Sequence, residues 1–446
     1  MMKTVAFYTL GCKVNHYETE VMMDEFRRAG YEIKKFDEKA DIYIINSCVV
    51  TNQAASKSRK YARRAKRKNK KALVIMVGCY PQVEQNEIEA IKEVDWILGT
   101  QGKSEIVNLI ERKSIKENNK MLKESLSYNE FTEYEEMSIK RLNKTTRAYI
   151  KVQEGCNQFC SYCIIPYARG QMRSRDPENI IKEIEHLINN QAVKEVVLTG
   201  IHLGAYGIER KDNYDLAALI FKMTQIKGLK RIRLSSIEVT EVDEQLLKLI
   251  KNNDKVCPHL HLPLQSASNL ILKKMNRPYT KEQFKEKVLE CRNMVPQIAI
   301  TTDIIVGFPG ETISEFAKTY SFAKEIAFSR LHVFPFSRRE NTTAYNMKPQ
   351  VRGDIKKKNA ARLRKLNKRL MSQYNKNYLN KIKKVIIEDN IDSKTGFYTA
   401  YTDNYIKVLV NAKKKDKGKI RKVKLTDCYN YEALLGSILQ KEEFIE

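Results

Sequence analysis

Three cysteines, Cys156, Cys160 and Cys163, lie in one short run with the spacing C-x3-C-x2-C, and no fourth cysteine follows nearby. Cysteine thiolates are the usual ligands of a [4Fe-4S] cluster. Three thiolates from one loop would hold three irons and leave the fourth open to a substrate. S-adenosylmethionine can chelate that iron through its amino and carboxylate groups. An electron from the cluster can then break the C–S bond of the sulfonium and release a 5′-deoxyadenosyl radical.

Other uses of these cysteines fit the sequence less well. A zinc site needs a fourth Cys or His at ordinary spacing, and the nearest histidines, His186 and His202, do not supply it. A disulfide framework does not suit a chain of 446 residues with nine cysteines. The start, MMKTVAFYTLGCKVN, predicts a first strand and not a secretory signal. No apolar run approaches the length of a membrane span, so we expect a cytoplasmic protein with no membrane partner.

The charge of the chain indicates a polyanionic partner. Lys and Arg number 81 against 54 Asp and Glu, which gives a formal net charge of +27. A Lys-rich genome can inflate surface lysines, but here the basic residues are clustered. They make up ten of the fifteen residues in 57–71 and eight of the twelve in 413–424. Both runs are denser than a solvated surface needs, which favours nucleic acid as the partner.

The chain as a whole predicts an α/β multidomain protein that begins with an open α/β domain over residues 1–112. A basic helix is expected over Ala54–Lys68. Residues 113–143 are polar and irregular, and they predict a linker. The expected strands of this first domain are Thr4–Leu10, Asp41–Ser47, Ala72–Gly78 and Trp96–Gly99.

A second alternation of strands and helices, over 144–372, predicts a partial (βα)6 barrel. In such barrels the chemistry lies at the C-terminal ends of the strands, and the three-cysteine loop directly follows the first strand. The expected strands are Ala148–Gln153, Glu195–Thr199, Lys230–Leu234, His259–Leu264, Ala299–Val306 and Arg330–Phe336. The helical patterns include Pro177–Asn189, Glu241–Asn252, Lys281–Met294 and a Lys/Arg-rich amphipathic helix over 354–372.

Residues 373–446 contain short β segments divided by polar or Gly-containing turns. This pattern predicts a small OB-like β-barrel with a basic surface. Its expected strands are Lys383–Glu388, Phe397–Thr402, Tyr405–Val410, Lys419–Leu425 and Glu432–Leu439.

A second set of cysteines, Cys12, Cys48 and Cys79, stands just past three predicted strands of the first domain. The carboxyl ends of parallel strands share one rim where ligands bind, so three cysteines distant in sequence can converge there. Gly11 and Gly78 would let the backbone approach a bulky inorganic ligand. The alternative is three ordinary buried thiols, but one cysteine at each of three strand ends favours a second cluster.

Several segments resemble the radical-SAM methylthiotransferases. LGCKVNHYE (10–18), NSCVVTNQAASKSR (46–59) and VGCYPQ (77–82) resemble the N-terminal domain of that family, and EGCNQFCSYCIIPYARG (154–170) resembles its radical-SAM motif. The segment 373–446 resembles its C-terminal TRAM domain. Within the family, LGCKVN and CVVTNQA are similar to the branch that acts on N6-threonylcarbamoyladenosine 37 of tRNA. The branches that act on isopentenyladenosine 37 or on a ribosomal protein are the alternatives.

The resemblance implies two clusters with distinct roles. Cys156, Cys160 and Cys163 would hold the radical-generating [4Fe-4S] cluster. The other three cysteines would hold an auxiliary [4Fe-4S] cluster that carries the sulfur. One S-adenosylmethionine would methylate that sulfur, and a second would yield the radical that takes hydrogen from C2 of the adenine. The implied partners are the tRNA anticodon stem-loop, with A37 as target, an electron donor such as flavodoxin or ferredoxin, and a sulfur donor whose nature stays open.

Polar residues and glycines at the strand ends are candidate contacts for the S-adenosylmethionine. DIIVGFPGET (303–312) resembles the radical-SAM segment that lies against the adenine, which makes Gly307, Pro309 and Gly310 candidates. The ends of other strands supply Thr199, Gly200, Ser235 and Gln265, which can bind the methionine or ribose or can cap helices.

The candidate RNA contacts are arginines near the cysteine loop and lysines near the C-terminus. Arg169, Arg173 and Arg175 can bind phosphate or pair with nearby acids. Tyr162 can stack on the cofactor or on a base, or it can simply pack. The C-terminal lysines Lys413, Lys414 and Lys415 are expected to bind phosphates. A non-catalytic RNA-binding protein held together by metals is the remaining alternative.

Overall fold

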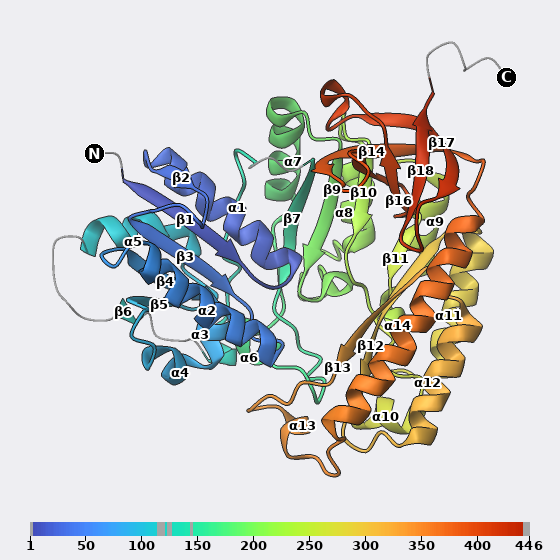
Figure 1. Ribbon diagram of the computed structural model, residues 1–446, viewed down its shortest axis with the longest axis horizontal. Helices are drawn as coiled ribbons and strands as arrows, with labels where there is room; N and C mark the ends of the chain where they lie inside the picture. The colour runs from blue at the N-terminus through green and yellow to red at the C-terminus, as the bar shows by residue number, and fades with distance from the viewer. Residues whose placement is uncertain (1–2, 114–120, 123–126, 143–145, 440–446) are drawn as a thin grey trace.

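The N-terminal part of the chain forms a six-stranded parallel sheet in the order β2-β1-β3-β4-β5-β6 (Figure 1). The computed structural model describes residues 3–113, 121–122, 127–142 and 146–439. The expected open parallel α/β architecture is therefore confirmed. The strands are β1 (Thr4–Thr9), β2 (Glu32–Lys34), β3 (Ile42–Ser47), β4 (Leu73–Gly78), β5 (Trp96–Leu98) and β6 (Met121–Leu122). The helices are α1 (Lys13–Arg28), α2 (Asn52–Lys68), α3 (Cys79–Val83), α4 (Gln85–Glu89) and α5 (Ile106–Lys113), with a 3-10 turn η1 (Lys103–Glu105).

The basic run of the N-terminal domain forms helix α2 because its small residues share one face. Ala55, Ser58, Ala62 and Ala65 are buried, and their spacing places them on one side of the helix. Thr51 caps the first turn, since its side chain accepts a hydrogen bond from the Ala54 N–H at 3.2 Å. The opposite side of α2 is left to its Lys and Arg side chains.

The segment 113–143, predicted as a linker, is packed where the structure describes it. Residues 114–120, 123–126 and 143 lie outside the described residues. Strand β6 extends the N-terminal sheet. After the 3-10 turn η2 (Tyr128–Glu130), Phe131, Met137 and Ile139 are almost fully buried, so this part of the chain is bound to the domains on either side of it.

The central part forms six parallel strands in the spatial order β7-β9-β10-β11-β12-β13. Hydrogen-bonded ladders join three of these strands on each side, and parallel bridges Ile232–Val256 and Ser236–His261 connect the two groups. The predicted partial barrel is therefore confirmed. The strands are β7 (Arg147–Glu154), β8 (Arg173–Ser174, antiparallel to β7), β9 (Glu195–Gly200), β10 (Arg231–Leu234), β11 (His259–His261), β12 (Ala299–Val306) and β13 (Arg330–Pro335). The helices are α6 (Ile165–Arg169), α7 (Pro177–Gln191), α8 (Leu216–Thr224), α9 (Glu244–Asn252), α10 (Asn269–Lys274), α11 (Lys281–Met294), α12 (Ile313–Ile326) and α13 (Thr343–Asn346), with 3-10 turns η3 (Leu203–Ala205) and η4 (Val239–Glu241).

Two boundaries differ from the sequence-based expectation for local reasons. Strand β11 ends at His261, three residues before its expected end, and Pro263 in the missing part has no N–H to donate to a ladder. Helix α9 begins at Glu244 and not at Glu241, because Asp243 caps it by accepting the Leu246 N–H at 2.7 Å.

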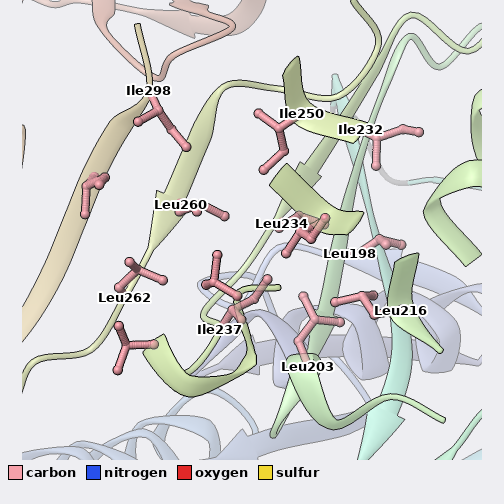
Figure 2. Packing of buried hydrophobic residues seen from close by; sticks show 14 of the residues in the cluster. Leu198, Leu203, Leu216, Ile232, Leu234, Ile237, Ile250, Leu260, Leu262 and Ile298 are labelled. Carbon is pink, nitrogen blue, oxygen red and sulfur yellow. The ribbon is translucent and has the colours of Figure 1, made fainter. Parts of the chain in front are cut away.

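The barrel strands separate an apolar shell from a polar interior. Figure 2 shows Leu198, Leu234 and Leu260, from three neighbouring strands, packed in the buried cluster that joins strands to helices. Side chains alternate along a strand, so the residue next to each of these leucines in its strand points to the other face of the sheet. There the barrel carries polar groups such as Ser235 and His261, which line a cavity.

The C-terminal part is a closed barrel with strand order β14-β15-β16-β18-β17, which confirms the predicted small β-barrel. The long helix α14 (Gly353–Lys376) leads into it along β13 (Figure 1). The strands are β14 (Ile382–Ile391), β15 (Tyr398–Thr402), β16 (Lys407–Val410), β17 (Ile420–Cys428) and β18 (Ala433–Ile438), with a 3-10 turn η5 (Lys414–Asp416). Arg231 and Arg233 attach this barrel to β10, since they donate hydrogen bonds to the carbonyls of Tyr401 and Asp403 at 3.0 and 2.8 Å. None of the helices in the described ranges has the length and apolarity to cross a membrane.

Candidate active site

The three N-terminal cysteines converge at the carboxyl rim of the sheet. Cys12 follows β1 as the N-cap of α1, Cys48 follows β3, and Cys79 begins α3 directly after β4. Burial raises the pKa of Cys48 to about 12, and the neighbouring thiols of Cys79 and Cys12 add to the rise. Gly11 has a φ of +112°, and a Cβ on it would lie 2.9 Å from the Cys48 Cβ. The three thiols therefore lie close together at this rim, because they follow three neighbouring parallel strands.

The barrel cysteines lie on a loop that backbone hydrogen bonds hold in place. The Cys156 N–H donates to the Gly170 carbonyl at 3.0 Å, and the Ser161 N–H donates to the Met275 carbonyl at 3.0 Å. Gly155 is required before the loop, because a Cβ there would lie 1.7 Å from the Gln171 carbonyl oxygen. These bonds fix the path of the loop at the carboxyl end of β7, where this type of barrel places its chemistry.

The donor chemistry of both sets suits an iron–sulfur cluster. All six cysteines are free thiols, and three thiolates from each set can each bind a different iron. Among the described residues, no group of three or more His, Cys, Asp or Glu side chains is placed to bind a single metal ion.

Two charged side chains that the sequence did not single out as site residues contact the barrel cysteines. His202 Nδ1 lies 3.7 Å from Cys156 Sγ, and Arg277 Nη1 donates to Cys160 Sγ at 3.3 Å. Burial alone would lower the pKa of His202, but Cys156 and the paired Glu241 raise it to about 10. His202 and Arg277 line a hollow of about 390 Å³ beside the loop, which is large enough for part of a small-molecule cofactor.

The predicted RNA contacts Arg169, Arg173 and Arg175 are corrected by the structure. All three are buried, with exposed fractions of 0, 5 and 1%, so none of them faces a phosphate. Arg173 donates to the carbonyls of Phe131 and Arg169, and Arg175 pairs with Glu183. The alternative for these arginines, that they pair inside the protein, is the one the structure shows.

Arg169 instead connects the two cysteine sets. Its Nε donates to Cys79 Sγ at 3.2 Å, and its Nη1 pairs with Glu18 of α1 and with Glu154 at the end of β7. Burial would raise the pKa of Glu18, but Arg169, together with Lys103 and Lys151, holds it at about 2. The same cations depress the pKa of Glu154. This ion cluster fixes the position of the N-terminal sheet against the barrel.

Of the predicted cofactor contacts, Thr199, Gly200 and Ser235 line the central cavity, and the others lie elsewhere. A Cβ on Gly307 would lie 2.4 Å from Lys356 Cγ, and one on Gly310 would lie 2.6 Å from Lys274 Nζ. Both glycines also have a positive φ, of 73° and 82°, which residues with a side chain rarely adopt, and this explains them. Pro309 is buried between them in the same turn.

Gln265 and Tyr162, two further predicted cofactor contacts, instead make contacts within the protein. Gln265 has a φ of 61° and joins the end of the β11 segment to β12 through its backbone, since its N–H donates to the Asp303 carbonyl at 2.9 Å. Tyr162 packs against the cluster that contains Phe308 and Phe336, which is the simple packing role that stood as the alternative for it.

The central cavity, of about 640 Å³, has walls from all three parts of the chain. Cys12 lines it from the N-terminal rim, Thr199 from the end of β9, and Tyr405 from the C-terminal barrel. The histidines on its wall, which the sequence did not single out, are His16 of α1 and, from the barrel strands, His259, His261 and His332. The three barrel histidines lie on β11 and β13. Their alternation with apolar residues in HLH and LHV of β11 and β13 was the signal for an inward polar face.

Another residue missed from the sequence, Arg339, lies in the loop after β13. It is 6% exposed, and its Nε and Nη2 have no hydrogen-bond partner among the described residues. Burial lowers its pKa, and the nearby Glu84 and Cys48 partly offset this. An unpartnered guanidinium therefore approaches the N-terminal thiols from the barrel side.

The partly buried histidine His332 predicts an acid-sensitive stability. Burial, together with the charge of His261, lowers its pKa from 6.5 to about 4. The unfolded chain therefore binds this proton first, so the contribution is present above pH 6.5 and is lost as the pH falls toward 4. At pH 5 the loss is on the order of 2 kcal/mol. Unfolding of wild type and His332→Gln at pH 7 and pH 5 measures it: the variant should show the smaller drop, and equal drops would refute the assignment.

A three-cysteine loop after the first strand of a partial (βα)6 barrel defines the class of radical-SAM enzymes. The family model described as the radical SAM superfamily matches residues 150–323, and one described as uncharacterized protein family UPF0004 matches residues 4–99. The chain is 44% identical, over 95% of its length and 94% of the relative's, to a threonylcarbamoyladenosine tRNA methylthiotransferase, MtaB, of Bacillus subtilis. It is 38% identical to one of Aquifex aeolicus, over 91% and 96% of the two chains.

The chain belongs to the radical-SAM methylthiotransferase family and is an enzyme of that class. S-adenosylmethionine and [4Fe-4S] clusters are the cofactors of this class. Among solved structures, the radical S-adenosylmethionine methyltransferase TsrM of Kitasatospora setae has a similar fold. It aligns with a TM-score of 0.57 and 15% identity over 77% of each chain.

Proposed function

We propose that this enzyme transfers a methylthio group to C2 of N6-threonylcarbamoyladenosine 37 in tRNA. The observation that carries the proposal is the connection of two three-thiol sets through Arg169, beside one cavity that Cys12 lines. Two relatives with MtaB names act on this nucleoside by name, at 44 and 38% identity. The net charge of +27 supports an RNA substrate over a protein.

The two cysteine sets have different roles in this proposal. Cys156, Cys160 and Cys163 would hold the cluster that binds S-adenosylmethionine, and Cys12, Cys48 and Cys79 would hold the auxiliary cluster. When bound, these groups and two molecules of S-adenosylmethionine would supply the sulfur, its methyl group and the radical that removes hydrogen from C2. The adenine C2–H is neither acidic nor electrophilic, so the protein's part is to position the base and exclude water.

The chain's own residues would carry out that positioning. Arg169 holds the N-terminal rim against the end of β7, so the two thiol sets keep one relative position. The loop bonds of Cys156 and Ser161 keep the barrel set in place. The target base would be flipped out of the RNA into the central cavity. A cytoplasmic location and a flavodoxin or ferredoxin as electron donor belong to the same proposal.

Nucleoside analysis tests the proposal. Anaerobically reconstituted enzyme, dithionite and S-adenosylmethionine are incubated with anticodon stem-loops that carry either N6-threonylcarbamoyladenosine or isopentenyladenosine at position 37. Mass spectrometry should find the 2-methylthio derivative of the first RNA only. A product formed from isopentenyladenosine alone, or on a ribosomal protein, would replace this substrate with the alternative. Protein that binds RNA but never forms 5′-deoxyadenosine would support the non-catalytic alternative.

The C-terminal barrel supplies a separate prediction about RNA affinity. Lys413, Lys414 and Lys415 are all exposed, and Lys413 and Lys415 line a hollow of about 1020 Å³ with Arg421. Changing all three lysines to Gln should weaken tRNA binding. It should also lower the slope of log Kd against log salt by about 1 for each phosphate that is no longer bound.

The matched control for this prediction changes three lysines of the N-terminal domain to Gln. These are Lys34 in β2, and Lys35 and Lys39 in the loop after it. Both variants lose the same charge, so a salt titration of binding separates a local effect from the overall charge. If the two triple variants gave the same slope, the C-terminal lysines would have no special role.

A further inference from the structure

Two buried polar atoms on the wall of the central cavity lack a partner. Ser235 is 5% exposed and His259 is 3% exposed, and Ser235 Oγ and His259 Nδ1 have no hydrogen-bond partner among the described residues. Both residues line the cavity. Buried polar atoms in proteins are nearly always hydrogen-bonded, so these two atoms are open to a polar group of a ligand in the cavity.

The same cavity has an excess of positive charge that the protein does not neutralise. Lys13, Arg330 and Lys407 line it from α1, β13 and β16, and within the described ranges none of them makes an ion pair. Of the two acids on the wall, Asp303 lies 3.2 Å from His261 Nε2, and Glu432 alone is without an ion-pair partner in the described part of the chain. Three free cations against one free carboxylate favour an anionic ligand.

Lys13 lines the same cavity as the two unpartnered atoms. His259, His332 and Tyr405 line this cavity as well, and the charge of Lys13 contributes to the lowered pKa of each of the three. The neighbouring arginines are already paired: Arg233 Nε lies 2.9 Å from Glu195, and Arg147 Nε lies 2.7 Å from Glu388. Of the free cations on this wall, Lys13 is the one that directly follows Cys12 in the chain, and it remains available to a ligand.

We propose that this cavity binds the N6 substituent of the target nucleoside, with Lys13 pairing its carboxylate. The inference rests on the proposed function, because N6-threonylcarbamoyladenosine carries an amino-acid carboxylate and a hydroxyl group. C2 and N6 lie on either side of N1 of the adenine. A base that presents C2 to the thiol set of Cys12 therefore carries its N6 substituent within reach of Lys13, the next residue.

The carboxylate of S-adenosylmethionine is the other possible source of such an anion. That cofactor would bind beside the Cys156 loop, with its own amino and carboxylate groups on the open iron. The subsite at Lys13 is therefore assigned to the substrate, and the test separates the two sources. An apolar isopentenyl group would leave Ser235 Oγ, His259 Nδ1 and the Lys13 ammonium unpaired, which is how a polar site rejects an apolar analogue.

Fluorescence anisotropy with three anticodon stem-loops tests the assignment on the reconstituted enzyme. The RNAs carry N6-threonylcarbamoyladenosine, its neutral carboxamide, or plain adenosine at position 37. Wild-type enzyme should bind the acid form about tenfold more tightly than the carboxamide. Lys13→Met should lose this preference, and Lys13→Arg should keep most of it. Lys39→Met, which removes a lysine at the opposite end of the same sheet, is the control and should behave as wild type.

The possible results separate this inference from the proposed function. If wild type methylthiolates the threonylcarbamoyl RNA but Lys13→Met keeps the preference for the acid form, the inference is wrong and the function stands. If Lys13→Met weakens S-adenosylmethionine binding and leaves RNA discrimination intact, Lys13 serves the cofactor and the inference is wrong. If wild-type enzyme acts only on isopentenyladenosine RNA, both are wrong.

A second measurement needs no substitution and so does not depend on how a variant folds or loads iron. In wild-type enzyme, the acid-form RNA should protect Lys13 from reductive methylation more strongly than the carboxamide RNA does. Peptide mass spectrometry reads the protection, with Lys39 as the unprotected reference. Equal protection of Lys13 by the two RNAs would overturn the assignment.

Discussion

Cys160→Ala should abolish the formation of 5′-deoxyadenosine and reduce the iron content to about half, while the protein stays folded. Cys160 is one of three thiols on the loop after β7, and Arg277 donates to its sulfur at 3.3 Å. Two thiolates cannot hold a cluster that needs three protein ligands. The loop itself should persist, because its path depends on backbone bonds such as Cys156 N–H to Gly170 O.

The paired variant Cys12→Ala should show the opposite pattern. It removes a thiol of the N-terminal set, so about half of the iron should again be lost, but 5′-deoxyadenosine should still form and no methylthio product should appear. Cys428→Ala, which changes a free thiol of the C-terminal barrel, is the control and should keep both activities.

Iron analysis, chromatography of 5′-deoxyadenosine and mass spectrometry of RNA nucleosides measure these outcomes. Wild-type levels of 5′-deoxyadenosine from Cys160→Ala would remove the basis for assigning the radical chemistry to this loop. Loss of both products from Cys12→Ala would mean that the two sets do not act separately.

The second large effect is expected for Arg169→Met, which should destabilise the protein by about 3 kcal/mol. Arg169 is fully buried and pairs with Glu18 and Glu154. Removal of one partner from a buried ion pair typically costs about 3–5 kcal/mol. The lower end applies here, because Lys103 and Lys151 still neutralise the two carboxylates.

Arg169→Lys should restore little of that stability. A single ammonium cannot donate to Cys79, Glu18, Glu154 and Asn15 in the directions that the guanidinium serves. Arg210→Met breaks a surface pair with Asp212 and is the control, with an expected cost below about 1 kcal/mol. Thermal unfolding compares the three variants, and iron content shows whether the N-terminal rim is retained. An Arg169→Met variant as stable as Arg210→Met would contradict a structural role for the ion cluster.

The alternation of strands and helices was predictable from local pattern alone. Strand β4 is a short apolar run, and the small residues that α2 buries recur at helical spacing. Both patterns depend only on residues close together in the sequence. The closed C-terminal barrel followed from five short β segments divided by turns. The two cysteine sets could be proposed because a cysteine at the end of a parallel strand has only one rim to occupy.

Whether an arginine is buried in an ion pair or exposed to RNA could not be predicted in the same way. Arg169 and an RNA-binding arginine look alike in sequence, because what distinguishes them is a partner far along the chain. Glu18 is 151 residues away from Arg169. The cavity could not be predicted for the same reason, since Lys13, His259 and Tyr405 on its wall come from three distant parts of the chain.

The sequence by itself determined most of the secondary structure, the position of both cysteine sets at strand ends and the class of chemistry, because spacing and periodicity act over a few residues. Only the tertiary structure decided which charges are buried as pairs and which remain free on the cavity wall. The physical reason is that the energy of a charge depends on its burial and on its nearest opposite charge, and both are set by the packing of distant segments against one another.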